Sequence, residues 1–121
     1  MKRDMDLIRK IVLTLEEAPT GYAPENLQIE GYTDEQIGYH AYLMIDAGLA
    51  TGGHTDISGA SSPFGFLNNL TWAGHEFAEA SRDETRWKKA MGIVQDKGGS
   101  VTVSVLTQLL TTLMKKTLGL P

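Results

Sequence analysis

Cysteine and long apolar runs are both missing from this chain of 121 residues. Without cysteine, the protein forms no disulfide and offers no thiolate to zinc or to nucleophilic catalysis. The most apolar tract, residues 101–120, is interrupted by threonine, serine, glutamine and lysine, so it is too polar to span a membrane. We therefore expect a protein that contacts no membrane and stays in the cytoplasm.

Lysine and arginine are absent from residues 11–81, which carry ten acidic side chains. These are Glu16, Glu17, Glu25, Glu30, Asp34, Glu35, Asp46, Asp56, Glu76 and Glu79. The basic residues lie at the two ends, and the whole chain has a net charge of -4. Because affinity for nucleic acid comes mainly from cations that neutralise phosphates, the acidic middle is poorly suited to bind DNA.

Caps and apolar spacing predict three helices in the first two thirds of the chain. Asp4 precedes a stripe of apolar residues at helical spacing, and Thr33 is followed three positions later by Gln36, the pattern of a capping box. Thr71 is placed to cap a third helix. We expect helices over residues 5–17, 34–47 and 72–81.

Three short segments favour extended structure. The alternating run Leu27–Ile29 predicts a brief strand. Leu49–Thr51 and Phe64–Leu70 are expected to pair as a hairpin, joined by the glycine- and serine-rich loop Gly52–Pro63. A helix, a hairpin and a further helix follow one another in a winged helix-turn-helix domain, and residues 34–47 then hold the position of the DNA-recognition helix.

The last third of the chain predicts two helices. Apolar residues at helical spacing, among them Trp87 and Val94, precede a break at Gly98-Gly99, and a second amphipathic stretch follows. We therefore expect a mainly α fold with a small β-hairpin. A winged-helix-like domain would occupy residues 1–81, and a helical pair over residues 82–121 would pack on it to form a single compact unit.

Four blocks of sequence resemble an uncharacterised bacterial and phage family, DUF2513. They are Met1–Ile11, the middle segments Ile29–Tyr32, Ile37–His40 and Ala47–Leu49, the block Leu70–Phe77 with Arg82-Asp83, and the late break at Gly98-Gly99. The resemblance implies a winged-helix-like fold and frequent occurrence in phage or prophage genomes. It implies no activity and assigns no functional residue.

The helix at the recognition position is the first candidate site. Burial of one face is expected to leave Asp34, Glu35, Gly38, Tyr39, Tyr42 and Asp46 exposed. Base readout favours arginine, lysine, asparagine or glutamine, and Gln36 alone qualifies on this helix. We therefore interpret Asp34, Glu35, Tyr39, Tyr42 and Asp46 as a surface for a protein partner. A second interpretation stays open, in which the two tyrosines pack on the C-terminal helices.

The second candidate site is the basic cluster Arg82, Arg86, Lys88 and Lys89, which suits an anion or DNA. The cluster could instead contact the acidic middle of the same chain or another copy, and a solvated helical face is the default interpretation. The last helix is apolar over more than one stripe, since Val105 and Leu109 lie off its main face. Either it packs within the chain or it forms a homodimer with a second copy.

Residues with catalytic chemistry occur only in weak patterns. The hairpin loop holds His54 and Asp56 near Ser58, Ser61 and Ser62, and a glycine-rich tip holds such groups loosely. His75 and Glu79 are four residues apart and offer two metal ligands, too few for a closed zinc site.

The sequence predicts no cofactor, no metal and no enzymatic activity. We expect a small acidic protein that acts by binding another protein with a basic surface. The alternative is a DNA-binding transcriptional regulator that uses its basic ends, and an enzyme is the third class.

Overall fold

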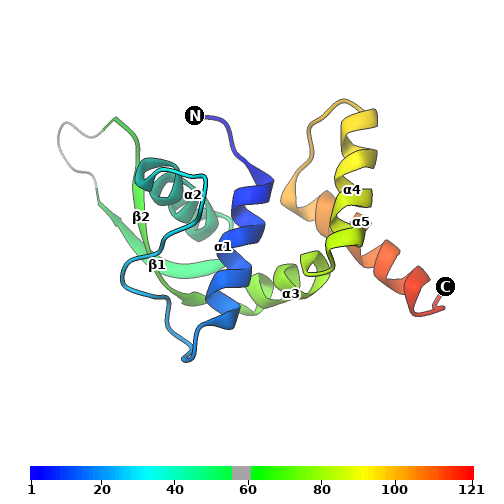
Figure 1. The fold of residues 1–121 in the computed structure, drawn as a ribbon, viewed down its shortest axis with the longest axis horizontal. Coiled ribbons are helices and arrows are strands. Elements are labelled where there is room, and N and C mark those ends of the chain that lie inside the picture. The colour runs from blue at the N-terminus through cyan, green and yellow to red at the C-terminus, as the bar shows by residue number, and fades with distance from the viewer. Residues whose placement is uncertain (56–60) are drawn as a thin grey trace. The chain divides into compact units, whose positions relative to one another are not determined.

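A computed structural model describes residues 1–55 and 61–121, which form five α-helices and one β-hairpin. The elements follow in the order α1 (Met5–Glu17), α2 (Asp34–Asp46), β1 (Ala50–Thr55), β2 (Phe64–Leu70), α3 (Trp72–Ser81), α4 (Glu84–Asp96) and α5 (Val103–Thr117), as labelled in Figure 1. The predicted class, mainly helical with a small hairpin, is confirmed. Among the described residues, no helix is both long and apolar enough to cross a membrane.

The chain divides into two compact units, Met1–Ala78 and Glu79–Pro121. The first unit contains α1, α2, the hairpin and most of α3, and the second contains the end of α3 with α4 and α5. In the second unit, Trp87 and Val94 of α4 are buried, as are Leu106 and Leu110 of α5.

The helices of the first unit begin at the predicted caps. Asp4 Oδ1 accepts the Leu7 N–H at 3.1 Å. Thr33 Oγ1 accepts the Gln36 N–H, while Gln36 Oε1 accepts the Thr33 N–H at 2.8 Å, which completes a capping box. Thr71 Oγ1 likewise accepts the Gly74 N–H at 3.1 Å. A cap uses residues within one helical turn, so sequence alone identifies it.

The hairpin is longer than predicted. β1 continues through Gly52–Thr55, which we expected to be loop, because these residues pair with Phe64–Leu67 of β2. The register slips by one residue between Thr51 and Gly52, which leaves Asn68 as the extra residue of a β-bulge. Pairing with a partner strand has overridden the weak strand propensity of glycine.

The strand predicted at Leu27–Ile29 was wrong. The structure has no regular secondary structure at these residues, and Tyr32 N–H closes a turn on the Ile29 carbonyl at 3.2 Å. A strand requires a neighbour to pair with. This connection instead makes one backbone bond to the sheet earlier in the chain, from Ala23 N–H to the Asn68 carbonyl at 2.7 Å.

β2 lies directly against α2, as Figure 1 shows. A Cβ on Gly65 would lie 2.4 Å from the Tyr42 backbone nitrogen and 2.8 Å from the Ala41 carbonyl carbon. The Phe64 ring covers Gly38 so closely that a Cβ there would lie 2.2 Å from Cε2 of the ring. Gly38 is therefore buried, and the prediction that it is exposed was wrong.

A buried histidine joins α1 to α2. The His40 ring is 1% exposed, its Nε2 accepts the Asp4 N–H at 2.8 Å, and its Nδ1 lies 2.8 Å from the Gln36 carbonyl oxygen. A carbonyl only accepts, so Nδ1 carries the proton and Nε2 is free to accept. This neutral tautomer anchors the start of α1 to the first half of α2.

Tyr32 lies at the same junction, with Lys10 Nζ 5.3 Å from the centre of its ring. Burial raises the pKa of Tyr32 above the ordinary 10.0. The pKa is raised further by the charge of Asp4, by a hydrogen bond with the Asp4 side chain and by the charge of Asp6. A raised folded-state pKa means that the folded protein holds this proton more tightly than the unfolded chain. The associated stability is present below pH 10.0 and is lost as the pH rises through the folded-state pKa.

We expect tyrosinate absorbance of the folded protein to show a late step from Tyr32, above the ordinary tyrosine pKa of 10.0. Tyr32→Phe should remove this late step. Asp4→Asn keeps a helix cap but removes the charge, so it should move the step to lower pH. The same titration in denaturant serves as the control and should lack the step. A late step that survives in Tyr32→Phe would contradict the assignment.

Candidate functional site

The five residues predicted to bind a partner lie on α2 but differ in exposure. Asp34, Glu35 and Asp46 are exposed, whereas Tyr39 and Tyr42 are half-buried. Asp34 and Glu35 occupy the first turn, where the helix dipole favours carboxylates. Asp46 occupies the last turn, where the same dipole disfavours a carboxylate, so helix stability does not account for its presence.

Glu35 is bonded within the first unit. Its Oε1 accepts the hydroxyl groups of Ser61 at 3.0 Å and Ser62 at 3.1 Å. These bonds tether the chain just before β2 to the first turn of α2. Glu35 therefore holds the hairpin. Asp34 accepts only a long bond from Gln28 Nε2 at 3.5 Å and stays exposed, so Asp34 and Asp46 are the carboxylates of α2 best placed to meet a partner.

The two tyrosines belong to an aromatic surface shared by α2 and β1. The Tyr39 and Tyr42 rings stack with centroids 6.3 Å apart, and Tyr42 meets the His54 ring edge-on at 5.6 Å. Within the first unit, these rings therefore pack on one another and on the hairpin. Their half-exposed faces suit a protein interface, where tyrosine is enriched.

A groove of about 450 Å³ lies beside α2 in the first unit. Three parts of the described chain line it: residues 22–27 of the connection after α1, one face of α2 formed by Asp34, Ile37, Gly38 and Ala41, and Phe64–Asn68 of β2. Its size falls within the range typical of ligand pockets. The groove therefore combines a helix, a strand and an irregular segment from three parts of the chain.

Aromatic and acidic side chains line this groove together. The Phe64 and Phe66 rings lie 5.7 Å apart, Phe66 is 51% exposed, and Tyr22 is 73% exposed. Glu25 and Asp34 supply carboxylates to the lining.

Sequence reasoning singled out Asp34 but missed the other residues of the groove. Only the fold brings residues 22–27 beside β2. The alternation Phe64-Gly65-Phe66 was the available signal, since it places two aromatic rings on one face of a strand.

Most of the predicted basic cluster is engaged within the second unit. Three of its four members bond to nearby residues: Arg82 to Glu79, Lys88 Nζ to Glu84 Oε1 at 3.7 Å, and Arg86 Nη1 to the Ala80 carbonyl at 3.2 Å. Lys89 is exposed. The carboxylates beside Arg82 and Lys88 partly offset the positive charge that the cluster offers to a phosphate.

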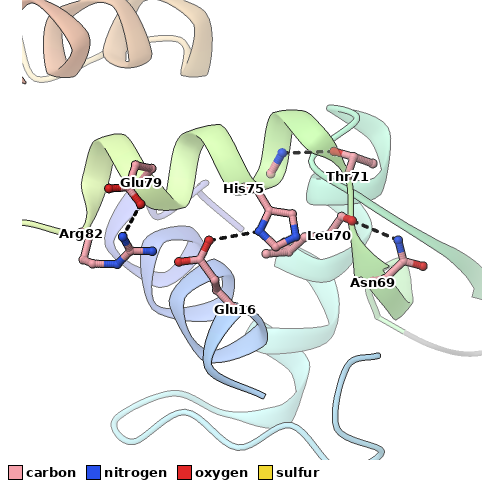
Figure 2. A network of polar contacts seen from close by, with 8 residues as sticks. Glu16, Asn69, Leu70, Thr71, His75, Glu79 and Arg82 are labelled. Carbon is pink, nitrogen blue, oxygen red and sulfur yellow. Dashed lines mark hydrogen bonds and ion pairs between the residues drawn. The ribbon is translucent and has the colours of Figure 1, made fainter. Parts of the chain in front are cut away.

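Two residues on α3 with metal-ligating side chains, His75 and Glu79, have different partners. His75 Nδ1 lies 3.1 Å from Glu16 Oε2 of α1, whereas Glu79 pairs with Arg82, as Figure 2 shows. Across residues 1–55 and 61–121, no group of three or more histidine, aspartate or glutamate side chains is placed to hold a metal ion.

The predicted catalytic residue types of the hairpin loop are only partly described. His54 contacts Tyr42, and Ser61 and Ser62 donate to Glu35. Asp56 and Ser58 lie outside the described residues.

Comparison with known proteins gives two matches. The model of a family described as "Hypothetical protein (DUF2513)" matches residues 2–100. An uncharacterised protein of Haemophilus influenzae is 31% identical over 122 residues, which cover 98% of this chain and all of the relative. No solved structure matches the chain. The family match and the full-length relative both agree with the resemblance seen in the sequence, and the chain belongs to the DUF2513 family.

Proposed function

We propose that this protein is a non-enzymatic accessory or regulatory protein that binds another protein through the acidic surface around α2. One observation carries the proposal: exposed carboxylates adjoin an aromatic groove in a stretch that contains no lysine or arginine. Exposed aromatic rings suit a protein interface, and the surrounding negative charge favours a partner with a basic surface.

The same charge distribution argues against DNA as the ligand of α2. A helix entering the major groove must approach phosphates on both sides, and residues 11–81 supply no lysine or arginine to neutralise them. DNA binding through the basic ends is the competing function. It would depend on Arg82, Arg86, Lys88 and Lys89, three of which are bonded locally.

The sequence resemblance adds a biological setting to the proposal. The resemblance implies frequent occurrence in phage or prophage genomes, and on that basis we place the protein among phage-associated accessory proteins that act in the cytoplasm of the producing cell. Self-association through α5 is compatible with this role, because Val105 is 53% exposed.

Neutralising the two exposed carboxylates of α2 that do not bond the hairpin tests the proposal. We expect the double variant Asp34→Asn/Asp46→Asn to bind the captured partner about fivefold more weakly, with less salt dependence, because two exposed charge pairs are lost. Stability should change little, since Asp34 lies at the favourable end of the helix dipole and Asp46 at the unfavourable end. Affinity capture with mass spectrometry identifies the partner, and calorimetry measures its affinity.

The matched control is the double variant Lys88→Gln/Lys89→Gln, which should leave partner binding unchanged. A gel shift with duplex DNA at low ionic strength completes the comparison. Two results together would support the DNA-binding regulator and contradict our proposal. They are salt-dependent DNA binding that the lysine variant loses, and a protein-partner affinity that the aspartate variant leaves unchanged.

A further inference from the structure

We propose that the groove beside α2 binds an extended segment of the partner protein. In this arrangement an aromatic or aliphatic side chain of the segment packs on Phe64 and Phe66, and a flanking lysine or arginine faces Glu25 and Asp34. The site rests on the protein-binding function proposed above, and it specifies which surface is used and which chemistry is recognised.

The apolar contact is available because two aromatic side chains are incompletely covered. Phe64 is half-buried where its ring packs over Gly38, and Phe66 beside it is 51% exposed. Tyr22, which is 73% exposed, belongs to the same lining. Burial of such rings by a partner side chain is the usual source of affinity at a protein interface, where aromatic residues are common hot spots.

The edge of β2 favours an extended occupant. In the described residues the sheet has two strands, so β2 pairs with β1 on one side only. On its other side, Ala23 N–H donates to the Asn68 carbonyl, and the described residues make no further backbone bond from outside the hairpin to β2. A strand edge that has a single such bond and lines a groove resembles the arrangement to which peptides add as a further strand.

The charge of the groove selects a basic segment. Glu25 and Asp34 both line it, and none of the described residues that line it is a lysine or arginine. A segment that carries carboxylates or phosphates would meet uncompensated negative charge, whereas lysine or arginine beside an apolar residue would be attracted. The occupant is therefore an extended, basic and partly apolar segment of another protein.

Peptide selection tests this site on the intact protein. Random dodecapeptides displayed on phage are selected against the wild-type chain, and an enriched peptide is synthesised and titrated by NMR. We expect sequences with a positive net charge and an aromatic or aliphatic anchor. Amide shifts should map to residues 22–27, 34–41 and 64–68, with intermolecular contacts between the peptide backbone and β2.

Two exposed aromatic residues provide a matched pair of variants. Phe66→Ser should weaken binding of the enriched peptide about tenfold, because it removes an anchor contact. Trp72→Ser removes a side chain that is 81% exposed and does not line the groove, so affinity should stay within about twofold. Both side chains are more than half exposed, so both variants should fold.

The outcomes separate the groove from the general function. Three results would overturn the groove site while leaving the protein-binding function intact. The amide shifts caused by basic peptides could map outside the groove, or the peptides could bind as helices. Alternatively, the peptides could lose affinity for Trp72→Ser and not for Phe66→Ser. Selection that enriches acidic peptides, or none, would overturn both. Sedimentation could show that the protein dimerises, and NMR shifts on dimerisation could map to the groove. A second copy would then be the occupant, which would also overturn the proposal.

Discussion

Replacing Gly65 with alanine should lower the free energy of unfolding by about 3 kcal/mol, the upper end of the usual cost of overpacking. The new Cβ would lie 2.4 Å from the Tyr42 nitrogen, 2.7 Å from the Tyr42 Cα and 2.8 Å from the Ala41 carbonyl carbon. All three are backbone atoms of α2, so no side-chain rotation relieves the clash. Strand and helix must move apart, and thermal unfolding should show a midpoint about 10 °C lower.

The adjacent strand offers a matched control. A Cβ on Gly53 would meet no atom within 4 Å, and Gly53 does not have a positive φ. Gly53→Ala should therefore change the unfolding free energy by less than about 0.5 kcal/mol. If Gly65→Ala melts at the same temperature as Gly53→Ala, then α2 and β2 do not approach one another as closely as the structure shows.

Replacing His40 with phenylalanine should cost about 2 kcal/mol of unfolding free energy. Phenylalanine keeps a ring of similar shape but has no nitrogen to accept the Asp4 N–H, which lies 2.8 Å from Nε2. The amide at the start of α1 then remains partly buried without its acceptor, and an unsatisfied donor costs more than the net value of the bond. Chemical denaturation measures the loss of stability.

Hydrogen exchange separates this lost bond from any effect of packing. The Asp4 amide should exchange faster in His40→Phe, because its acceptor is gone. His75→Phe is the matched control, since the exposed His75 bonds Glu16 at the surface and such pairs contribute little. We expect that variant to stay within about 0.5 kcal/mol of wild type. An Asp4 amide that exchanges equally in both variants would contradict the role of His40.

Local signals in the sequence predicted the helix starts well. Asp4, Thr33 and Thr71 each accept a backbone N–H three positions ahead, so everything that the cap requires lies within a few residues. The same holds for the apolar stripe of α1, where helical spacing identified the buried face. These features are encoded at short range, and the structure agrees with them.

Three predictions that depended on contacts between segments far apart in the sequence were wrong. Gly52–Thr55 was expected to be loop but is strand, because Phe64–Leu67 provides the opposite ladder. Leu27–Ile29 was expected to be strand but lacks a partner to pair with. Gly38 was expected to be exposed but is covered by Phe64, a residue from the far side of the hairpin. In each case the deciding contact lies well outside the local segment.

The sequence by itself determined the helical class, the hairpin, the family, and the separation of charge between an acidic middle and basic ends. Helix caps and apolar periodicity depend on residues close together in the sequence, and composition is a property of the whole chain. These features can therefore be read without knowing which distant segments are in contact. Only the tertiary structure decided that Glu35 accepts hydrogen bonds from Ser61 and Ser62. It also decided that one groove is lined by Asp34 together with Tyr22, Glu25, Phe64 and Phe66. A groove is a property of segments brought together by packing, so no single stretch of sequence contains it.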